Sequence, residues 1–299
     1  MIQDRPPLGI ALMLGFCILA PMGDAIAKML GDTIPLTQML FVRFFVQMVI
    51  LWPIIWSVKL PVIISPRVFW LMVLRTVLHI IGIAAMFTSL RYLPLADAIA
   101  IAFVMPFIML LLGKYFLHEE VGTHRLGACV SGFIGTLLVI QPSFVDVGAP
   151  ALLPLFVAVV FALFMLVTRK IAKEVDAIHL QAQSGFIATI LLGIILFIAR
   201  GLEIEALKIV APTRTEWFWL VAIGTFGTVA HLLMTWSLRF APSATVAPMQ
   251  YLEIPIATII GLIFFKDFPN GSAALGITVT IGAGLYIIFR EKRLSHQIT

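Results

Sequence analysis

The feature that most restricts the fold is a succession of long apolar segments joined by short turns. Three of them, residues 177–199, 217–238 and 268–289, contain no Asp, Glu, Lys or Arg. An α-helix needs about 20 apolar residues to cross the hydrocarbon core of a bilayer. A soluble fold could not hide the apolar surface of a chain that is 61% hydrophobic and only 12% charged. Lipid is therefore the solvent that fits this sequence.

We predict an all-α membrane protein with ten transmembrane helices. Turn-forming residues such as Pro and Gly separate the apolar segments. No segment alternates apolar and polar residues, which excludes a transmembrane β-barrel. The predicted helices cover residues 8–30, 36–58, 68–90, 95–117, 123–141, 151–169, 178–200, 216–238, 243–265 and 272–289.

An internal repeat divides the chain. Residues 90–96 (LRYLPLA) match residues 238–244 (LRFAPSA), and residues 116–119 (FLHE) match residues 264–267 (FFKD). Both matches have an offset of 148, which random apolar sequence would not preserve.

The repeat is five helices long, and five is an odd number, so the second copy must be upside-down relative to the first. We expect a first repeat over residues 1–145 and a second over residues 146–299. Inverted repeats are typical of secondary transporters, which bind substrate at the repeat interface near the midplane. Channels can also be built in this way, so the repeat alone leaves both classes open.

Rows of small residues follow the same repeat. They are Gly127, Ser131 and Gly135 on the fifth helix, and Gly276, Thr280 and Gly284 on the tenth. Small residues let helices approach closely, within a monomer or between two copies. A monomer and a homodimer are both compatible with this pattern.

The positive charges indicate the orientation of the chain. If both termini are cytoplasmic, twelve Lys and Arg residues fall on that side and five on the other, as the positive-inside rule requires. We therefore expect a multi-pass protein of a bacterial inner membrane with both termini inside. The basic residues are scattered singly, so the net charge of +5 does not indicate a nucleic-acid partner.

Motifs for catalysis and cofactors are absent from the sequence. There is no H-E-x-x-H, no G-x-S-x-G and no phosphate-binding G-x₄-G-K-[ST]. The two cysteines, Cys17 and Cys129, lie in apolar runs without metal-ligand spacing. We expect no enzymatic activity, no catalytic residue, no bound metal and no cofactor. Energy for transport must come from a gradient, from exchange, or from nothing beyond the substrate's own gradient.

Several short motifs carry a resemblance to a known family. They are residues 23–28 (GDAIAK), 42–45 (VRFF), 74–75 (LR), 93–98 (LPLADA), 116–120 (FLHEE), 241–248 (APSATVAP) and 250–253 (QYLE). The chain resembles the EamA family of the drug/metabolite transporter superfamily, whose members have ten helices in two inverted five-helix repeats. The first and last motifs look most like the subgroup of bacterial S-adenosylmethionine uptake carriers, and they also resemble riboflavin carriers.

This resemblance implies a secondary transporter of a small organic metabolite that works by alternating access. Its substrate would be similar to S-adenosylmethionine or to a vitamin such as riboflavin. An amino-acid or drug exporter of the same family is the alternative.

Glu253 is the acidic residue expected nearest to the midplane, because it lies about ten residues, or roughly 15 Å, into the ninth helix. Pro248 and Pro255 flank it and permit a kink that could line a cavity. Beside Gln250 and Tyr251, this carboxylate suits an organic cation or a coupling proton. A structural pairing with an arginine is the alternative.

Other polar residues fall inside the predicted helices, where charges usually face the bundle interior. Arg75 and His79 are four residues apart and so share one face of the third helix. They and Arg43 could bind a substrate carboxylate or hold helices together. Trp236, like Tyr251, could stack on a planar ligand.

Asp24 and Lys28 also lie four residues apart, near the end of the first helix. They could form an ion pair that joins consecutive turns. Alternatively, they could belong to a gate.

Overall fold

The computed structural model describes residues 5–58, 65–119, 121–199, 204–267 and 271–297, and its regular structure is helical throughout. Eight helical segments are long and apolar enough to cross a membrane, and α6 and α12 complete the ten predicted helices. The first repeat contains α1 (Pro6–Leu30), α2 (Leu36–Val58), α3 (Pro66–Ser89), α4 (Leu95–Ala102), α5 (Met105–Phe116) and α6 (Thr123–Val147). The second contains η1 (Ala149–Leu152), α7 (Leu153–Ile171), α8 (Ala177–Ile198), η2 (Glu205–Leu207), α9 (Arg214–Phe240), α10 (Ser243–Val246), η3 (Ala247–Leu252), α11 (Glu253–Phe265) and α12 (Gly271–Gln297).

The fourth and ninth spans are interrupted helices. In the ninth, a six-residue 3₁₀ segment, η3, separates α10 from α11, and Pro248 lies in its first turn. Proline has no N–H to donate and clashes with the preceding helical turn, which explains the expected departure from a continuous α-helix. The fourth span is broken between Ala102 and Met105, a break that the sequence did not predict, although Pro106 follows it directly.

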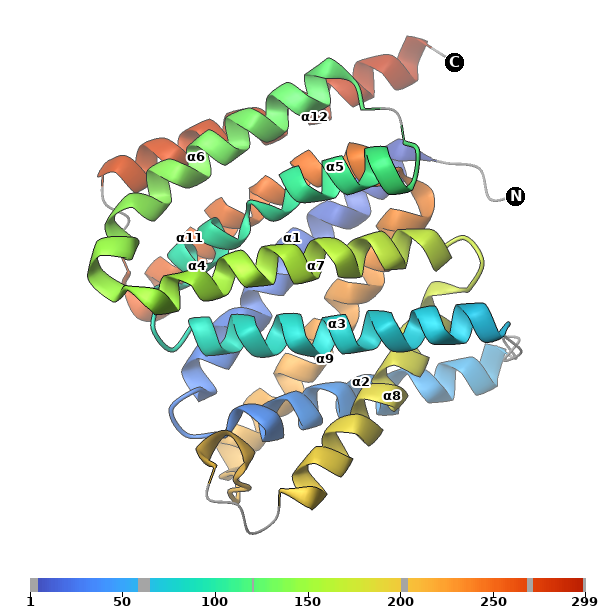
Figure 1. Ribbon diagram of the computed structural model, residues 1–299, viewed down its shortest axis with the longest axis vertical. Helices are drawn as coiled ribbons and strands as arrows, with labels where there is room; N and C mark the ends of the chain where they lie inside the picture. The colour runs from blue at the N-terminus through green and yellow to red at the C-terminus, as the bar shows by residue number, and fades with distance from the viewer. Residues whose placement is uncertain (1–4, 59–64, 120, 200–203, 268–270, 298–299) are drawn as a thin grey trace.

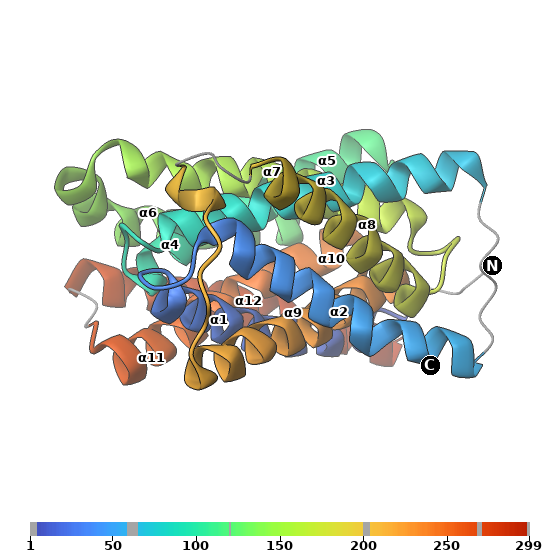
Figure 2. The ribbon, with the colours of Figure 1, turned by 90° about the horizontal axis from the view of Figure 1, so that it is seen from below.

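The spans form two layers, which Figure 2 shows edge-on. One layer contains α3, α4, α5, α6 and α7, and the other contains α1, α9, α11 and α12, while α2 and α8 pack together at one end of both. Each layer thus combines helices from both repeats. The expected boundary between residues 145 and 146 therefore does not separate the two layers in space.

Equivalent helices of the two repeats make equivalent packing contacts. In the repeat register α1 corresponds to α7 and α3 to α9, and α1 packs on α9 as α7 packs on α3. The corresponding pairs α2 with α8 and α6 with α12 pack on each other. Exchanging the two repeats leaves these contacts unchanged, which is the pattern of a pseudo-twofold axis between inverted repeats.

The last turns of α5 and α11 end in the same conformation. His118 and Lys266, with φ of 53° and 58°, are the non-glycine residues of the described chain that have positive φ. The next residue in each case donates its N–H to the carbonyl six residues back, from Glu119 at 3.1 Å and from Asp267 at 3.3 Å. This left-handed cap turns each chain sharply out of its helix.

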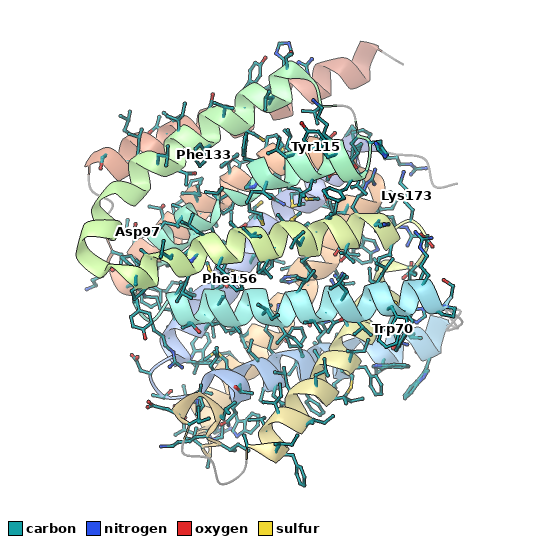
Figure 3. The ribbon with its side chains drawn as sticks, viewed as in Figure 1. Trp70, Asp97, Tyr115, Phe133, Phe156 and Lys173 are labelled. Atoms are coloured by element: carbon teal, nitrogen blue, oxygen red, sulfur yellow. The ribbon has the colours of Figure 1, made fainter. Side chains whose placement is uncertain are left out.

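The bundle has two distinct faces. α1 begins and α12 ends on the same side, at the right of Figure 1, and we call it the terminal face. The opposite side, the far face, carries the turns at residues 31–35, 90–94 and 148–152. Figure 3 places Trp70, Tyr115 and Lys173 toward the terminal face and Asp97 at the far face.

Candidate functional site

A cavity of about 90 Å³ lies between the two layers. By the usual requirement of about 10–15 Å³ for each molecule, it has room for a handful of waters. Most of its wall is apolar and aromatic, and its polar lining consists of Asp24, Arg43, His231 and Glu253. Such a site, apolar with a few convergent polar groups, is typical of small-molecule binding.

The cavity occupies the half of the bundle that is remote from the termini. Toward the far face its lining includes Ile99 and Val157, each four residues, or roughly 6 Å, into its α-helix. Toward the terminal face the lining ends at Phe16 and Glu253, which lie near the middle of their spans. A ligand of metabolite size therefore needs the far half to open further, while the terminal half is already filled.

Two carboxyl groups face this space without a partner. Glu253 is the first residue of α11 and is 7% exposed. Asp24 lines the same cavity from α1, and the two carboxyl groups interact electrostatically. Among the described residues neither accepts a hydrogen bond or forms an ion pair. Arg43, which lines the same cavity, attracts Asp24 electrostatically. Glu253 has no cationic partner among the described residues, and a buried charge without a partner is costly, so its position favours a cationic ligand or a proton.

Arg43 is the cation of the cavity, and it comes from α2. Its Nη2 lies 3.3 Å from Nδ1 of His231, whose Nδ1 is also 2.9 Å from the carbonyl oxygen of Gly227. Nη1 of Arg43 and Nε2 of His231 are buried with no partner in the described chain. Gly227 leaves room for this guanidinium, since an added Cβ would lie 2.9 Å from its Nε and Nη2.

On the terminal side of the cavity, Arg75 is fully buried and joins three helices of the second repeat. Its Nε donates to Thr168 at 2.8 Å, Nη1 to Ser184 at 2.7 Å and Nη2 to Thr235 at 3.4 Å. Its guanidinium also stacks on the ring of Phe164 at 4.6 Å. Each of its three nitrogens has one hydroxyl partner, so Arg75 holds α7, α8 and α9 together in this state.

His79 lies one helical turn from Arg75 and is also fully buried. Its ring stacks on Phe164 at 4.5 Å and lies 4.3 Å from the ring of His231. Neither ring nitrogen of His79 has a partner within the described residues. The imidazoles therefore link the Arg75 cluster to the polar wall of the cavity.

Three other predicted site residues point away from the cavity. The Tyr251 hydroxyl donates to the carbonyl of Cys129 at 3.1 Å, and its ring lies against Gly132 of α6. Trp236 packs with the cluster between α2 and α8. Gln250 donates to Sδ of Met165 at 3.1 Å in the terminal half. The structure thus brings Asp24, Arg43 and Glu253 together and leaves these three outside the cavity.

Asp24 and Lys28 are not paired with each other. The Lys28 ammonium donates to the carbonyls of Leu90 at 3.2 Å and Leu93 at 2.6 Å, so it joins α1 to the end of α3. Asp24 turns to the cavity one helical turn deeper. Their i,i+4 spacing predicts that both lie on one side of the helix. It does not predict that carbonyl groups at the end of α3 bind the Lys28 ammonium in place of Asp24.

At the terminal face, α1 and α9, which belong to the same layer, are in close contact. The N–H of Arg5 donates to the carbonyl of Phe240 at 2.6 Å, and Ser237 donates to the carbonyl of Gly9 at 2.7 Å. A Cβ added to Gly9 would collide with Ala241.

An ion pair that the sequence did not single out closes the same face. Nε of Arg169 donates to Oε1 of Glu119 at 3.1 Å, and its Nη1 donates to the carbonyl of Leu238 at 2.6 Å. Glu119 also accepts from the N–H groups of Ser243 and Ala244 at 3.2 Å and 3.1 Å. The internal repeat was the sequence feature that could have indicated Glu119, because it aligns this residue with another acid, Asp267.

The polar cavity wall can recognise charge without a metal. Within the parts of the chain that the structure describes, no group of three or more His, Cys, Asp or Glu residues could hold an ion. Two carboxyl groups facing one guanidinium across an apolar space suit an organic molecule that carries a positive and a negative group.

Comparison with known proteins adds a family and several relatives. The sequence profile of the EamA-like transporter family matches residues 7–141 and again residues 149–290. Proteins named S-adenosylmethionine uptake transporter are similar along nearly their whole length. That of Rickettsia conorii is 25% identical over 289 residues, 97% of this chain and 95% of the relative, and that of Rickettsia bellii is 24% identical over 286 residues, 96% and 95% respectively.

A protein named riboflavin transporter from Rhizobium johnstonii is 31% identical over 224 residues, which cover 75% of this chain and 72% of that protein. A solved protein structure superimposes with a TM-score of 0.70 at 17% identity, covering 96% of this chain and 97% of the other. At that identity the likeness shows the fold alone.

Proposed function

Because this chain belongs to the EamA-like transporter family, we propose that it is a secondary carrier that takes up S-adenosylmethionine or a close analogue by alternating access. It is a multi-pass membrane transporter and not an enzyme. The substrate class and the direction of transport are the proposed part. Relatives named S-adenosylmethionine uptake transporter, similar over at least 95% of their length, support both.

The observation that carries the substrate proposal is the charge pattern of the cavity. S-adenosylmethionine has a sulfonium, an ammonium and a carboxylate group. Asp24 and Glu253 supply two carboxyl groups for the cations, and Arg43 has an unpartnered Nη1 that can donate to the carboxylate. The aromatic rings of Phe16, Phe103 and other lining residues offer apolar surface to the adenine.

Transport requires that the cavity open to one face at a time. We propose that the two repeats, residues 1–145 and 146–299, are related by a pseudo-twofold axis and that each forms an equivalent half of the substrate path. The two layers would be the bodies that move, with α1 and α2 moving alongside α9–α12. In this scheme the present state is closed at the terminal face by the contacts of Arg169 and Glu119, and it forms its cavity toward the far face.

The scheme also proposes an orientation and a coupling ion. Both termini would be in the cytoplasm of a bacterium, with the far face outside, as the Lys and Arg distribution favours. Glu253 would bind a proton when no cation occupies the cavity, since a buried carboxylate that lacks a partner is less costly when neutral.

Purified protein in proteoliposomes tests the proposal. We expect saturable uptake of radiolabelled S-adenosylmethionine that excess unlabelled substrate suppresses and excess riboflavin does not. Glu253→Gln should abolish most of it, whereas Glu205→Gln, the same change at an exposed site, should not. Absence of competable flux, or equal flux in the two variants, would refute the assignment. Flux only out of vesicles would instead favour an exporter, and competition by amino acids or drugs would then test the alternative of an amino-acid or drug exporter.

Riboflavin is the second candidate substrate. The aromatic rings that line the cavity, Phe16, Phe87, Phe103 and Phe161, suit a flat isoalloxazine ring. Riboflavin carries no charge that requires Asp24 or Glu253. Uptake of riboflavin that is insensitive to Glu253→Gln would therefore favour this candidate over the cationic one.

A further inference from the structure

We propose that Asp267 and Lys28 form an ion pair at the far face that is the counterpart of the Glu119–Arg169 pair at the terminal face, and that the two pairs form alternately. The proposal rests on the alternating-access part of the proposed function and is independent of the substrate. We call the Glu119–Arg169 pair the terminal clamp and the Asp267–Lys28 pair the far clamp.

The terminal clamp connects the two layers. Glu119 and Arg169 belong to the layer of α3–α7, and Leu238 lies on α9 in the other layer. Ser243 and Ala244 lie on α10, which contacts helices of both layers. The Ser243 hydroxyl also donates to Glu119. Both charged side chains are nearly buried, at 9% and 10% exposure. Charge-assisted hydrogen bonds in such a setting are stronger than exposed pairs, so this network favours closure of the terminal face.

The repeat places the same chemistry at the far face. Asp267 follows the left-handed residue Lys266 as Glu119 follows His118, so the same backbone cap directs each acid out of its helix. Lys28 lies two residues before the end of α1, as Arg169 lies two residues before the end of α7.

The cations also have corresponding carbonyl partners. Arg169 donates to the carbonyl of Leu238 at 2.6 Å. Lys28 donates to the carbonyl of Leu90 at 3.2 Å, and Leu90 is the repeat equivalent of Leu238. One half of the far clamp, the bond from the cation to the end of the third helix, is therefore already made.

The other half is not made in this state. Asp267 has no ion-pair partner within the described residues, although it attracts Lys28 electrostatically. No side chain of the described chain accepts from the N–H groups of Leu95 and Ala96, which correspond to Ser243 and Ala244. The cavity lies on this same side. One clamp is complete where the bundle is closed, and its counterpart is incomplete where the cavity has formed.

Two other carboxylates, Asp97 and Asp32, also act on Lys28. Asp97 lies on α4 itself, and Asp32 follows α1 in the same layer as Lys28. Asp267 follows α11, across the layer boundary from α4, and is the one of the three that repeats the left-handed cap of Glu119. Asp97 could also join the layers through Lys28, but Asp267 is the acid that occupies the position of Glu119 in the repeat.

Reactivity of a buried cysteine can report which face is open, with no substrate present. In a background with Cys17→Ala and Cys129→Ala, a Met165→Cys reporter replaces a side chain that is 1% exposed in the closed terminal half. Its reaction rate with N-ethylmaleimide is measured in detergent-purified protein. Opening of the terminal face exposes it and raises the rate.

We expect Glu119→Gln to raise the labelling rate about tenfold, because it removes the charge from the terminal clamp. Asp267→Asn should lower the rate several-fold, because it weakens the state in which the far face is closed. Asp32→Asn, the same charge change near the same lysine, should leave the rate unchanged. A Lys28→Cys/Asp267→Cys pair should form a disulfide faster when Glu119→Gln is also present.

The proposal is overturned if Asp267→Asn and Asp32→Asn change the labelling equally, or if Glu119→Gln does not speed the cross-link. If Glu119→Gln fails to fold, the Asp267→Asn result decides, since that carboxylate has no ion-pair partner to lose in this state. Failure of S-adenosylmethionine uptake would not affect these measurements, so the two proposals can fail separately.

Discussion

Gly227→Ala is expected to weaken substrate binding through Arg43 without touching the ligand itself. The new methyl group would lie 2.9 Å from Nε and Nη2 of Arg43 and 3.0 Å from its Cζ. Carbon and nitrogen atoms need about 3.5 Å, so the guanidinium must move. Its 3.3 Å contact with Nδ1 of His231 would then be broken.

The expected loss of substrate affinity follows from this displacement of Arg43. A hydrogen bond to a charged group contributes about 1.5–3 kcal/mol. If Arg43 holds the carboxylate of the substrate, its misplacement should weaken binding about tenfold or more, since about 1.4 kcal/mol corresponds to a factor of ten. Alanine is a better helix former than glycine by about 1 kcal/mol, so loss of the helix is not an expected cause.

Gly127→Ala is the matched control, because Gly127 does not line the cavity and an added Cβ there meets nothing within 4 Å. The dissociation constant of S-adenosylmethionine would be measured by titration calorimetry on both variants in detergent, with melting temperatures recorded alongside. The reasoning is refuted if Gly227→Ala binds within about twofold of the unmodified protein, or if both variants lose affinity equally.

Three further variants test the site and its packing. Glu253→Gln should lower affinity for a cationic substrate about tenfold or more and flatten the pH dependence of uptake; an unchanged pH profile would remove this carboxyl group from coupling. Arg75→Lys should cost about 1–3 kcal/mol, because an ammonium cannot reproduce the fork that reaches three helices, and an unaltered melting temperature in detergent would contradict that role. Gly132→Ala, whose Cβ would lie 2.5 Å from the Tyr251 ring, should destabilise by about 1–3 kcal/mol, whereas Gly127→Ala, with nothing within 4 Å, should not; equal melting temperatures would refute the contact.

The prediction of the fold rested on local information. Hydropathy located the ten helices, because backbone groups in lipid must bond within their own segment. The offset of 148 residues identified the repeat, and its family match confirms two copies. The prolines indicated the interruption of the ninth helix, whereas the break after Ala102 has no proline within it and was missed.

Residue types alone predicted less of the site. Position in the apolar runs placed Asp24, Arg43 and Glu253 inside the predicted helices, and the structure puts all three on one cavity. Gln250 and Tyr251 are neighbours of Glu253 in sequence, yet Gln250 bonds Met165 and Tyr251 bonds the carbonyl of Cys129. For Tyr251 the reason is that η3 winds with about three residues per turn, so residues two apart lie on different faces. Their roles as ligand contacts stay predictions without support from this arrangement.

The sequence by itself determined that this chain spans a membrane with two related sets of five helices. This depends on each segment alone, because each apolar segment must form its own backbone hydrogen bonds and be long enough to cross the bilayer. Only the tertiary structure decided which polar groups meet. Arg43 and His231 are 188 positions apart and Arg169 and Glu119 are 50 apart. Lipid is as apolar as the helix surfaces, so steric fit and the need to satisfy buried polar groups select such pairs, and neither can be read from hydropathy.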